Sequence, residues 1–242
     1  YEVSRQDASR VGIELPGFEA FWEQGYAESP IPETPFCALS EFRADPEHNR
    51  LKTPSGKIEI FSDTIASFHY DDCPGHPVWM EPLEWLGSEK SADFPLHMIS
   101  NQPAGKLHAQ MDFAGASHDG KINGREPVLI NPDDATKRGI SQHDLVRVFN
   151  ARGATLAAAV LTDGVMPGVI RLATGAWYDP VERGKVGALD RHGNPNLLTP
   201  DKGTSSLAQG PIAHTALVEV EVYRDDPGDI TVFRPPEILE TA

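Results

Sequence analysis

The chain has 242 residues, of which 39% are hydrophobic, and its formal net charge at pH 7 is −15. This length allows one large domain or two small ones, and the hydrophobic fraction is sufficient for a core. The acidic balance argues against a nucleic-acid partner or an anionic membrane surface, because phosphate groups are bound by clustered lysines and arginines, and the absence of a run of about 18 apolar residues argues against a membrane span.

Residues 1–90 form the less regularly patterned part of the chain. The first residue is Tyr1, and no signal-peptide pattern follows it, so we interpret the chain as a fragment of something longer. The aromatic residues within 16–26 have helical spacing, and 53–62 (TPSGKIEIFS) combines a turn with strand-like alternation. We therefore predict that residues 1–90 are an irregular α/β connector segment belonging to the preceding part of a larger protein.

Cys37 and Cys73 are the only two cysteines. Neither belongs to a C-x-x-C pair, which argues against an iron–sulfur or zinc site built from cysteine. Two interpretations stay open: one disulfide, or two buried free thiols, of which we prefer the second.

The pattern becomes regular in residues 91–242, where Val, Ile, Leu and Thr dominate several short runs. The tetrapeptide at 150–153 (NARG) fits a hairpin turn, and Pro167 with Gly168 fits the centre of a type II turn. We predict six strands, at 95–100, 127–131, 145–150, 154–162, 169–174 and 215–223.

One helix is clearly predicted, at 131–139 (NPDDATKRG). Asn131 can cap it, Pro132 suits its first position, and Gly139 can end it in the left-handed conformation. Six strands with one or two short helices predict a mainly β fold with short helices, and a compact barrel in preference to an open parallel sheet. No dinucleotide-binding G-x-G-x-x-G or P-loop sequence occurs.

Three polar, turn-rich segments follow or precede these strands: 100–110 (SNQPAGKLHAQ), 174–180 (TGAWYDP) and the long loop 190–215. Long loops in a compact domain are usually functional or disordered, and this one carries amides and hydroxyls but little charge, which suits contact with a polar ligand. His108 as a structural histidine and Trp177 as a core aromatic remain the simpler alternatives. Because no histidine pair has metal-ligand spacing and no G-x-S-x-G sequence occurs, we predict neither a metal ligand nor a catalytic residue.

Taken together, these segments resemble one known family, the C-terminal domain of the molybdopterin oxidoreductases. Within the family, the resemblance is greatest to the branch of dimethyl sulfoxide, trimethylamine N-oxide and biotin sulfoxide reductases. It covers about residues 53–223 and depends on five motifs in the same order: SNQPAGKLHAQ, NGREPVLINPDDATKRGISQHDLVRVFNARG, MPGVIRLATGAWYDP, HGNPNLLT and GTSSLAQG.

The resemblance implies a six-stranded double-psi β barrel at 91–242, the molybdopterin dinucleotide-binding domain. It also implies the bis(molybdopterin guanine dinucleotide) form of the molybdenum cofactor, and a shared cleft for SNQPAGKLHAQ and HGNPN. The family usually has arginine where this chain has Lys106, and serine where it has Ala109. By resemblance, the cofactor-binding residues are Ser100, Asn101, Gln102, Pro103, Lys106, His108, Ala109, Gln110, Asn196, Ala213 and His214.

The function implied by the resemblance is that of the C-terminal cofactor-binding part of a molybdenum-dependent sulfoxide or N-oxide reductase, an oxygen-atom transfer enzyme. The isolated chain is expected to be inactive, because the metal-ligating and substrate-funnel segments are not in it. The implied partners are the remaining domains of the same reductase, a sulfoxide or N-oxide substrate and an unknown electron donor. The expected compartment is the cytoplasm or the periplasm, with the cytoplasm preferred.

Two alternatives remain open at the level of the sequence. A double-psi barrel that has lost its cofactor would act as a protein-binding module. A fragment from the formate dehydrogenase or nitrate reductase branch would share the fold and the cofactor but catalyse a different reaction.

Overall fold

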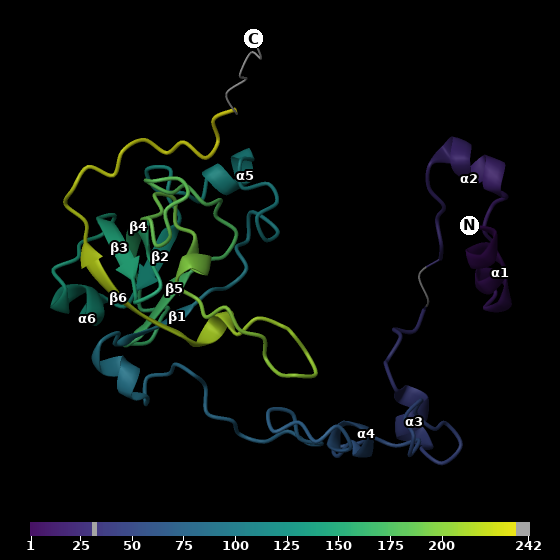
Figure 1. The fold of residues 1–242 in the computed structure, drawn as a ribbon. Coiled ribbons are helices and arrows are strands. Elements are labelled where there is room, and N and C mark those ends of the chain that lie inside the picture. The colour runs from purple at the N-terminus through teal and green to yellow at the C-terminus, as the bar shows by residue number, and fades with distance from the viewer. Residues whose placement is uncertain (31–32, 236–242) are drawn as a thin grey trace, which may run out of the picture. The chain divides into compact units, whose positions relative to one another are not determined.

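The computed structural model describes residues 1–30 and 33–235 (Figure 1). The chain divides into two compact units, Tyr1–Phe61 and a larger one that begins at Ser62. The predicted division of the chain between residues 90 and 91 stays a prediction. No helix within the described ranges has the length and apolar character needed to cross a membrane.

The first unit contains short helices without buried residues: α1 (Glu2–Arg10), α2 (Phe18–Gln24) and α3 (Ser40–Ala44). Helix α2 confirms the helix predicted from the aromatic spacing, and it ends at Gly25 in the left-handed conformation. The strand predicted within 53–62 is wrong, because Ile58 and Ile60 are 69% and 80% exposed and no strand forms there. A strand needs a hydrogen-bonded neighbour, and none pairs with this segment among the described residues.

Both cysteines carry free thiols. Cys37 is exposed and Cys73 is half-buried. The preferred interpretation of two free thiols is therefore confirmed, whereas the expected burial of both is wrong.

The second unit is built around a closed six-stranded barrel in which all six predicted strands are confirmed (Figure 1). The order around the barrel is β1-β5-β2-β4-β3-β6. The pairs β1–β5 and β2–β4 are parallel, and the other four are antiparallel. This topology confirms the predicted mainly β, double-psi barrel class. The strands are β1 (Leu96–Ile99), β2 (Pro127–Ile130), β3 (Leu145–Phe149), β4 (Ala154–Leu161), β5 (Val169–Leu172) and β6 (Ala216–Val222).

Short helices connect or flank the strands: α4 (Asp63–Ala66), η1 (Glu89–Ala92), α5 (Gly115–His118), α6 (Pro132–Lys137), η2 (Pro195–Leu197) and η3 (Ala213–Thr215). Helix α6 begins as predicted, because the Asn131 side chain accepts a hydrogen bond from the Asp133 N–H at 3.0 Å. Gly168, in the predicted turn before β5, has φ = +80°, which is the conformation that a type II turn requires at that position.

The core follows from the alternation of side chains along the strands. On β2, Val128 and Ile130 are fully buried inside the barrel. On β5, Ile170 and Leu172 are fully buried as well. The intervening residues of both strands therefore face outward, and they form part of the wall of the cavity described below.

Glu84 attaches the segment before η1 to the barrel. Its buried carboxylate accepts hydrogen bonds from Arg152 at 2.6 and 2.9 Å and from the Leu217 N–H at 2.9 Å. Burial alone would raise the pKa of Glu84, but these hydrogen bonds and the Arg152 charge lower it to about 2. The carboxylate therefore stays ionised, and it joins the β3–β4 hairpin to β6.

Candidate functional site

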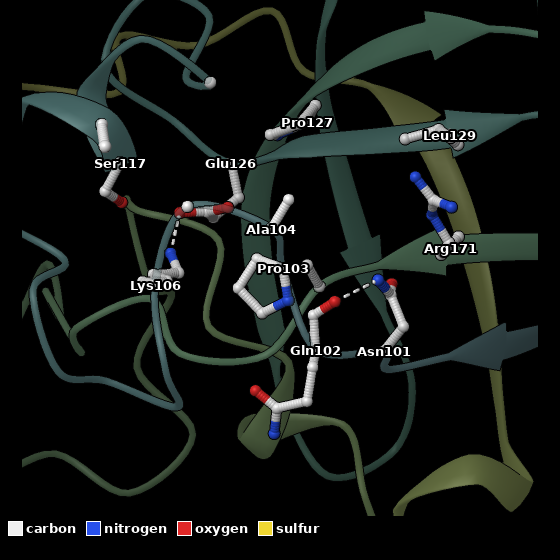
Figure 2. A pocket seen from close by; sticks show the side chains of 14 residues that line it. Asn101, Gln102, Pro103, Ala104, Lys106, Ser117, Glu126, Pro127, Leu129 and Arg171 are labelled. Atoms are coloured by element: carbon white, nitrogen blue, oxygen red, sulfur yellow. Dashed lines mark hydrogen bonds and ion pairs between the residues drawn. The ribbon is translucent and has the colours of Figure 1, made fainter. Parts of the chain in front are cut away.

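A cavity of about 600 Å³ lies where β1 and β5 end and β2 begins (Figure 2). The loop after β1 forms one wall, from Asn101 to Lys106, and helix α5 contributes Ala116 and Ser117. The remaining wall residues are Gly120, Glu126, Pro127, Leu129, Arg171 and Ala173. Apart from two glycines, half of the lining residues have apolar side chains and half have polar or charged ones. Ligand-binding cavities of this volume commonly combine apolar walls with polar groups that fix the orientation of the ligand.

The strand register explains which side chains reach the cavity. Arg171 on β5 pairs with Ile99 on β1 and with Leu129 on β2. Paired residues point to the same face of a sheet, so these three side chains lie on the outer face of the barrel. Figure 2 shows Arg171 next to Leu129, with Asn101 below it, on one side of the cavity.

Four buried charged groups lie behind the cavity wall: Lys106, Asp112, Lys121 and Glu126. Each ammonium group bonds to both carboxylates, and the distances to Asp112 Oδ1 are 2.7 Å from Lys106 and 2.9 Å from Lys121. All four side chains are at most 6% exposed. Because two positive groups face two negative ones, this charge quartet is neutral as a unit.

The charges of the quartet are fixed by these contacts. Burial alone would raise the pKa of Asp112, but hydrogen bonds from Lys106, Lys121 and the Trp177 N–H lower it to about 2. Burial alone would lower the pKa of Lys106, but its bonds to Asp112 and Glu126 raise it. Asp112 and Lys106 therefore remain ionised at neutral pH.

Acid is expected to lower the free energy of unfolding of the second unit, which contains both Glu84 and Asp112, as the pH falls from about 4.5 to about 2. The pKa values of Asp112 and Glu84 fall from their ordinary 3.8 and 4.5 to about 2 in the folded chain. A lowered pKa contributes stability that is fully present above the ordinary value and is lost as the pH falls through the folded value, roughly 2–3 kcal/mol for each group. Urea denaturation at about pH 7 and about pH 3 measures this loss, and equal free energies of unfolding would contradict it.

The loop 100–110 is held in shape by its own side chains. Gln102 Oε1 accepts a hydrogen bond from the His108 N–H at 3.3 Å, and its Nε2 lies 3.0 Å from His108 Nδ1. His108 adopts a left-handed backbone conformation with φ = +50°. The Ala109 carbonyl accepts a hydrogen bond from Trp177 Nε1 at 2.7 Å. These contacts fix the loop whose first half lines the cavity.

The segment 174–180 packs directly against this loop. Gly175 has φ = +99°, and a Cβ built at this position would lie 1.8 Å from the His108 carbonyl oxygen. The Trp177 N–H donates to Asp112 Oδ2 at 2.9 Å, which joins the segment to the charge quartet. A glycine is therefore required where the two polar segments meet.

His192 contacts the segment 174–180 through Trp177, and it is fully buried. Its Nδ1 is 3.0 Å from the Trp177 carbonyl oxygen, and the Phe233 ring contacts it edge-on with the ring centroids 5.0 Å apart. Burial and the Lys121 charge lower the pKa of His192. The imidazole is therefore neutral, and Nδ1–H donates to the Trp177 carbonyl.

Asp190 organises the segment HGNPN (192–196), a role that sequence reasoning missed. Its buried carboxylate accepts from the N–H groups of Gly193 and Asn194, both at 2.9 Å, and from Thr155 Oγ1 at 2.6 Å. An aspartate three residues before a Gly-Asn pair is a typical turn signal, but only the fold shows that β4 supplies a further donor.

The shared cleft predicted for SNQPAGKLHAQ and HGNPN is not confirmed, because the first cavity is lined by residues of the first stretch and by none of the second. The two stretches meet at Glu126, whose N–H donates to the His192 carbonyl at 3.2 Å and whose carboxylate bonds to Lys106. Asn196 lies elsewhere, in the lining of a second cavity of about 530 Å³ formed with residues of 199–211.

The predicted cofactor-binding residues therefore fall into four groups. Asn101, Gln102, Pro103 and Lys106 line the first cavity, and the rest of their loop (Ser100, His108, Ala109 and Gln110) does not. Asn196 lines the second cavity, and Ala213 and His214 lie in η3, outside both linings. The binding roles of all these residues stay predictions. Sequence reasoning missed Arg171, although a charged residue within an alternating apolar strand was a usable signal.

The groups at the first cavity fit a polar heterocyclic ligand. Asn101 Oδ1 is buried and has no hydrogen-bond partner in the described structure, and such a group costs roughly 1–3 kcal/mol. The guanidinium of Arg171 also has no hydrogen-bond or ion-pair partner in residues 1–30 and 33–235. An unsatisfied carbonyl, an unpaired cation and apolar walls are the chemistry that a pterin or a nucleotide requires.

Comparison with known proteins agrees with this geometry. Residues 96–217 match the family described as the molydopterin dinucleotide binding domain. The chain is 49% identical to a trimethylamine-N-oxide reductase from Salmonella typhi over 97% of its length. It is 45% identical to a dimethyl sulfoxide/trimethylamine N-oxide reductase and 47% identical to a biotin sulfoxide reductase, both from Cereibacter sphaeroides, over 98% and 95% of its length.

These relatives are much longer proteins, because the chain spans only 28–30% of their lengths. Among solved structures, acetylene hydratase from Pelobacter acetylenicus aligns with 89% of this chain and 28% of its own, at a TM-score of 0.61 and 21% identity. That likeness shows the fold alone. The match over 96–217 includes strands β1 to β5, the first two residues of β6 and the loop that lines the cavity. The chain therefore belongs to the molydopterin dinucleotide binding domain family, and it is homologous to part of the dimethyl sulfoxide, trimethylamine N-oxide and biotin sulfoxide reductases.

Proposed function

We propose that this chain is the cofactor-binding C-terminal part of a molybdenum-dependent sulfoxide or N-oxide reductase. The observation that carries the proposal is the cavity, because four of the residues expected to bind the cofactor line it together. The sequence similarity to three kinds of reductase supports the same function.

The cofactor form that we propose is bis(molybdopterin guanine dinucleotide), with this domain covering mainly one of the two dinucleotides. Asn101 and Gln102 would bind polar edges of its ring systems, and the apolar wall formed by Pro127 and Leu129 would contact ring faces. When bound, the molybdenum centre would supply the oxygen-atom transfer. This chain would contribute binding and orientation, and it would exclude water from the enclosed part of the ligand.

The proposal assigns the metal-ligating and substrate-funnel segments to the remaining domains of the longer reductase, since the relatives are more than three times as long as the matched part. The isolated chain would therefore be inactive. The other partners in the proposal are a sulfoxide or N-oxide substrate and an electron donor of unspecified kind. We propose the cytoplasm or the periplasm as its compartment, with the cytoplasm preferred.

Cofactor retention tests this proposal. The chain purified from a host that makes the molybdenum cofactor is expected to carry pterin and guanine nucleotide, measured by mass spectrometry after mild extraction. His108→Ala is expected to lower the retained amount about tenfold, because Gln102 Nε2 loses its contact with the imidazole Nδ1 and only the backbone N–H of residue 108 still holds Gln102.

His143→Ala is the matched control. His143 is also an exposed histidine with a left-handed backbone, φ = +68°, but it lies outside the cavity. Its replacement is expected to leave retention unchanged. A wild-type chain that carries neither pterin nor nucleotide would contradict the proposal and favour the cofactor-free binding module.

A further inference from the structure

The cavity wall carries three charged residues: Lys106, Glu126 and Arg171. The first two are bonded to each other within the charge quartet, and the side chain of Lys106 is only 2% exposed. Its ammonium group already has two carboxylate partners, Asp112 and Glu126. Lys106 is the cation that the sequence assigned to the cofactor, yet its charge is balanced from within the protein.

Arg171 is in the opposite situation. Its in-register neighbours, Ile99 on β1 and Leu129 on β2, are both apolar. Arg147, the other arginine on a barrel strand, pairs in register with Glu221 and forms an ion pair with it at 2.9 Å. The strand pairing that neutralises Arg147 therefore leaves Arg171 without an acidic partner.

Arg171 is exposed at the cavity wall and has no carboxylate partner among the described residues, although acidic side chains are abundant in a chain with net charge −15. Its guanidinium offers a planar set of donors that suits two oxygens of a phosphate group. Its in-register neighbours Ile99 and Leu129 offer no competing acceptor side chain, so the guanidinium is available to a ligand.

We propose that Arg171, and not Lys106, is the residue of this cavity that binds a phosphate group of the ligand. This inference deepens the proposed function and rests on it, since the phosphate would be part of the dinucleotide. Lys106 then acts as a positioning residue, which holds the cavity loop through Asp112 and Glu126 without contacting the ligand charge.

The test measures the binding of GDP, inorganic pyrophosphate and uncharged guanosine to the chain by isothermal titration calorimetry. Four proteins are compared: wild type, Arg171→Met, Arg171→Lys and Arg183→Met. Arg183→Met is the matched control, because Arg183 is exposed in a loop outside the cavity and the change in net charge is the same.

Arg171→Met is expected to weaken GDP and pyrophosphate binding by about ten- to a hundredfold at low ionic strength, and to leave guanosine binding unchanged. The salt dependence of GDP binding should become shallower, because one screened charge contact is lost. Arg171→Lys should retain part of the affinity, since it keeps the charge but loses the planar fork, and Arg183→Met should behave like wild type.

Three results would overturn the inference: equal GDP binding by wild type and Arg171→Met, equal losses for GDP and guanosine, or equal losses in Arg171→Met and Arg183→Met. In each of these cases the proposed function would still stand if the chain retains cofactor. Wild-type chain that binds neither GDP nor pyrophosphate also overturns the inference, and cofactor retention then decides the proposed function separately.

Discussion

Gly175→Val is expected to lower the free energy of unfolding by about 3–5 kcal/mol, or to prevent folding of the cavity region altogether. The new Cβ would lie 1.8 Å from the His108 carbonyl oxygen and 3.1 Å from Lys106 Cε. The backbone φ of +99° also disfavours any side chain, and a β-branched one most strongly. The segment 174–180 would therefore have to separate from the loop it packs against, and urea denaturation measures the result.

Gly187→Val is the control that distinguishes the steric clash expected at Gly175 from the strain of a side chain at positive φ. Gly187 also has a positive φ, +73°, but a Cβ there has nothing within 4 Å. Its replacement is expected to cost only the strain of a left-handed conformation, about 1–2 kcal/mol. Equal stabilities for the two variants would show that the close approach of Gly175 to His108 does not matter.

The second large effect is expected from Lys106→Met, at about 3–5 kcal/mol of lost stability. The substitution removes one positive group from a buried, neutral quartet and leaves two carboxylates, Asp112 and Glu126, facing one ammonium group, that of Lys121. A buried carboxylate without a full set of partners is costly, so the loss exceeds the net contribution of the ion pair itself.

Two comparisons make this prediction specific to the buried charges. The double variant Lys106→Met with Glu126→Gln restores neutrality and is expected to recover part of the lost stability. Lys185→Met removes a lysine from the exposed pair with Glu182, in which both side chains are about 60% exposed, and it is expected to change stability by less than about 1 kcal/mol. If Lys106→Met and Lys185→Met proved equally stable, the quartet would not be the element that holds the cavity loop.

The barrel was predictable from the sequence because apolar residues that face the core alternate along its strands with residues that face outward. Val128 and Ile130, for example, are buried while their neighbours on β2 face outward. The same rule failed for residues 58–60, where alternation occurs without a partner strand in the described structure. Alternation thus predicts a strand only where hydrogen-bonding neighbours are available.

The candidate site was less predictable because its contacts depend on pairing in three dimensions. Lys106 looked like a ligand contact in the sequence, and only the fold brings Asp112, Lys121 and Glu126 around its ammonium group. Arg171 was not singled out in the sequence, and only the register shows that its in-register neighbours are both apolar. The charge that a side chain offers to a ligand depends on the partners it already has.

A crystal structure of the cofactor-loaded protein tests the central claim most directly. We expect density for a pterin dinucleotide in the cavity bounded by 101–106 and β2, with a phosphate group within hydrogen-bonding distance of Arg171. Density for the cofactor at full occupancy that leaves this cavity empty, for example beside Asn196 alone, would show that the strand-end loop of this barrel does not bind it.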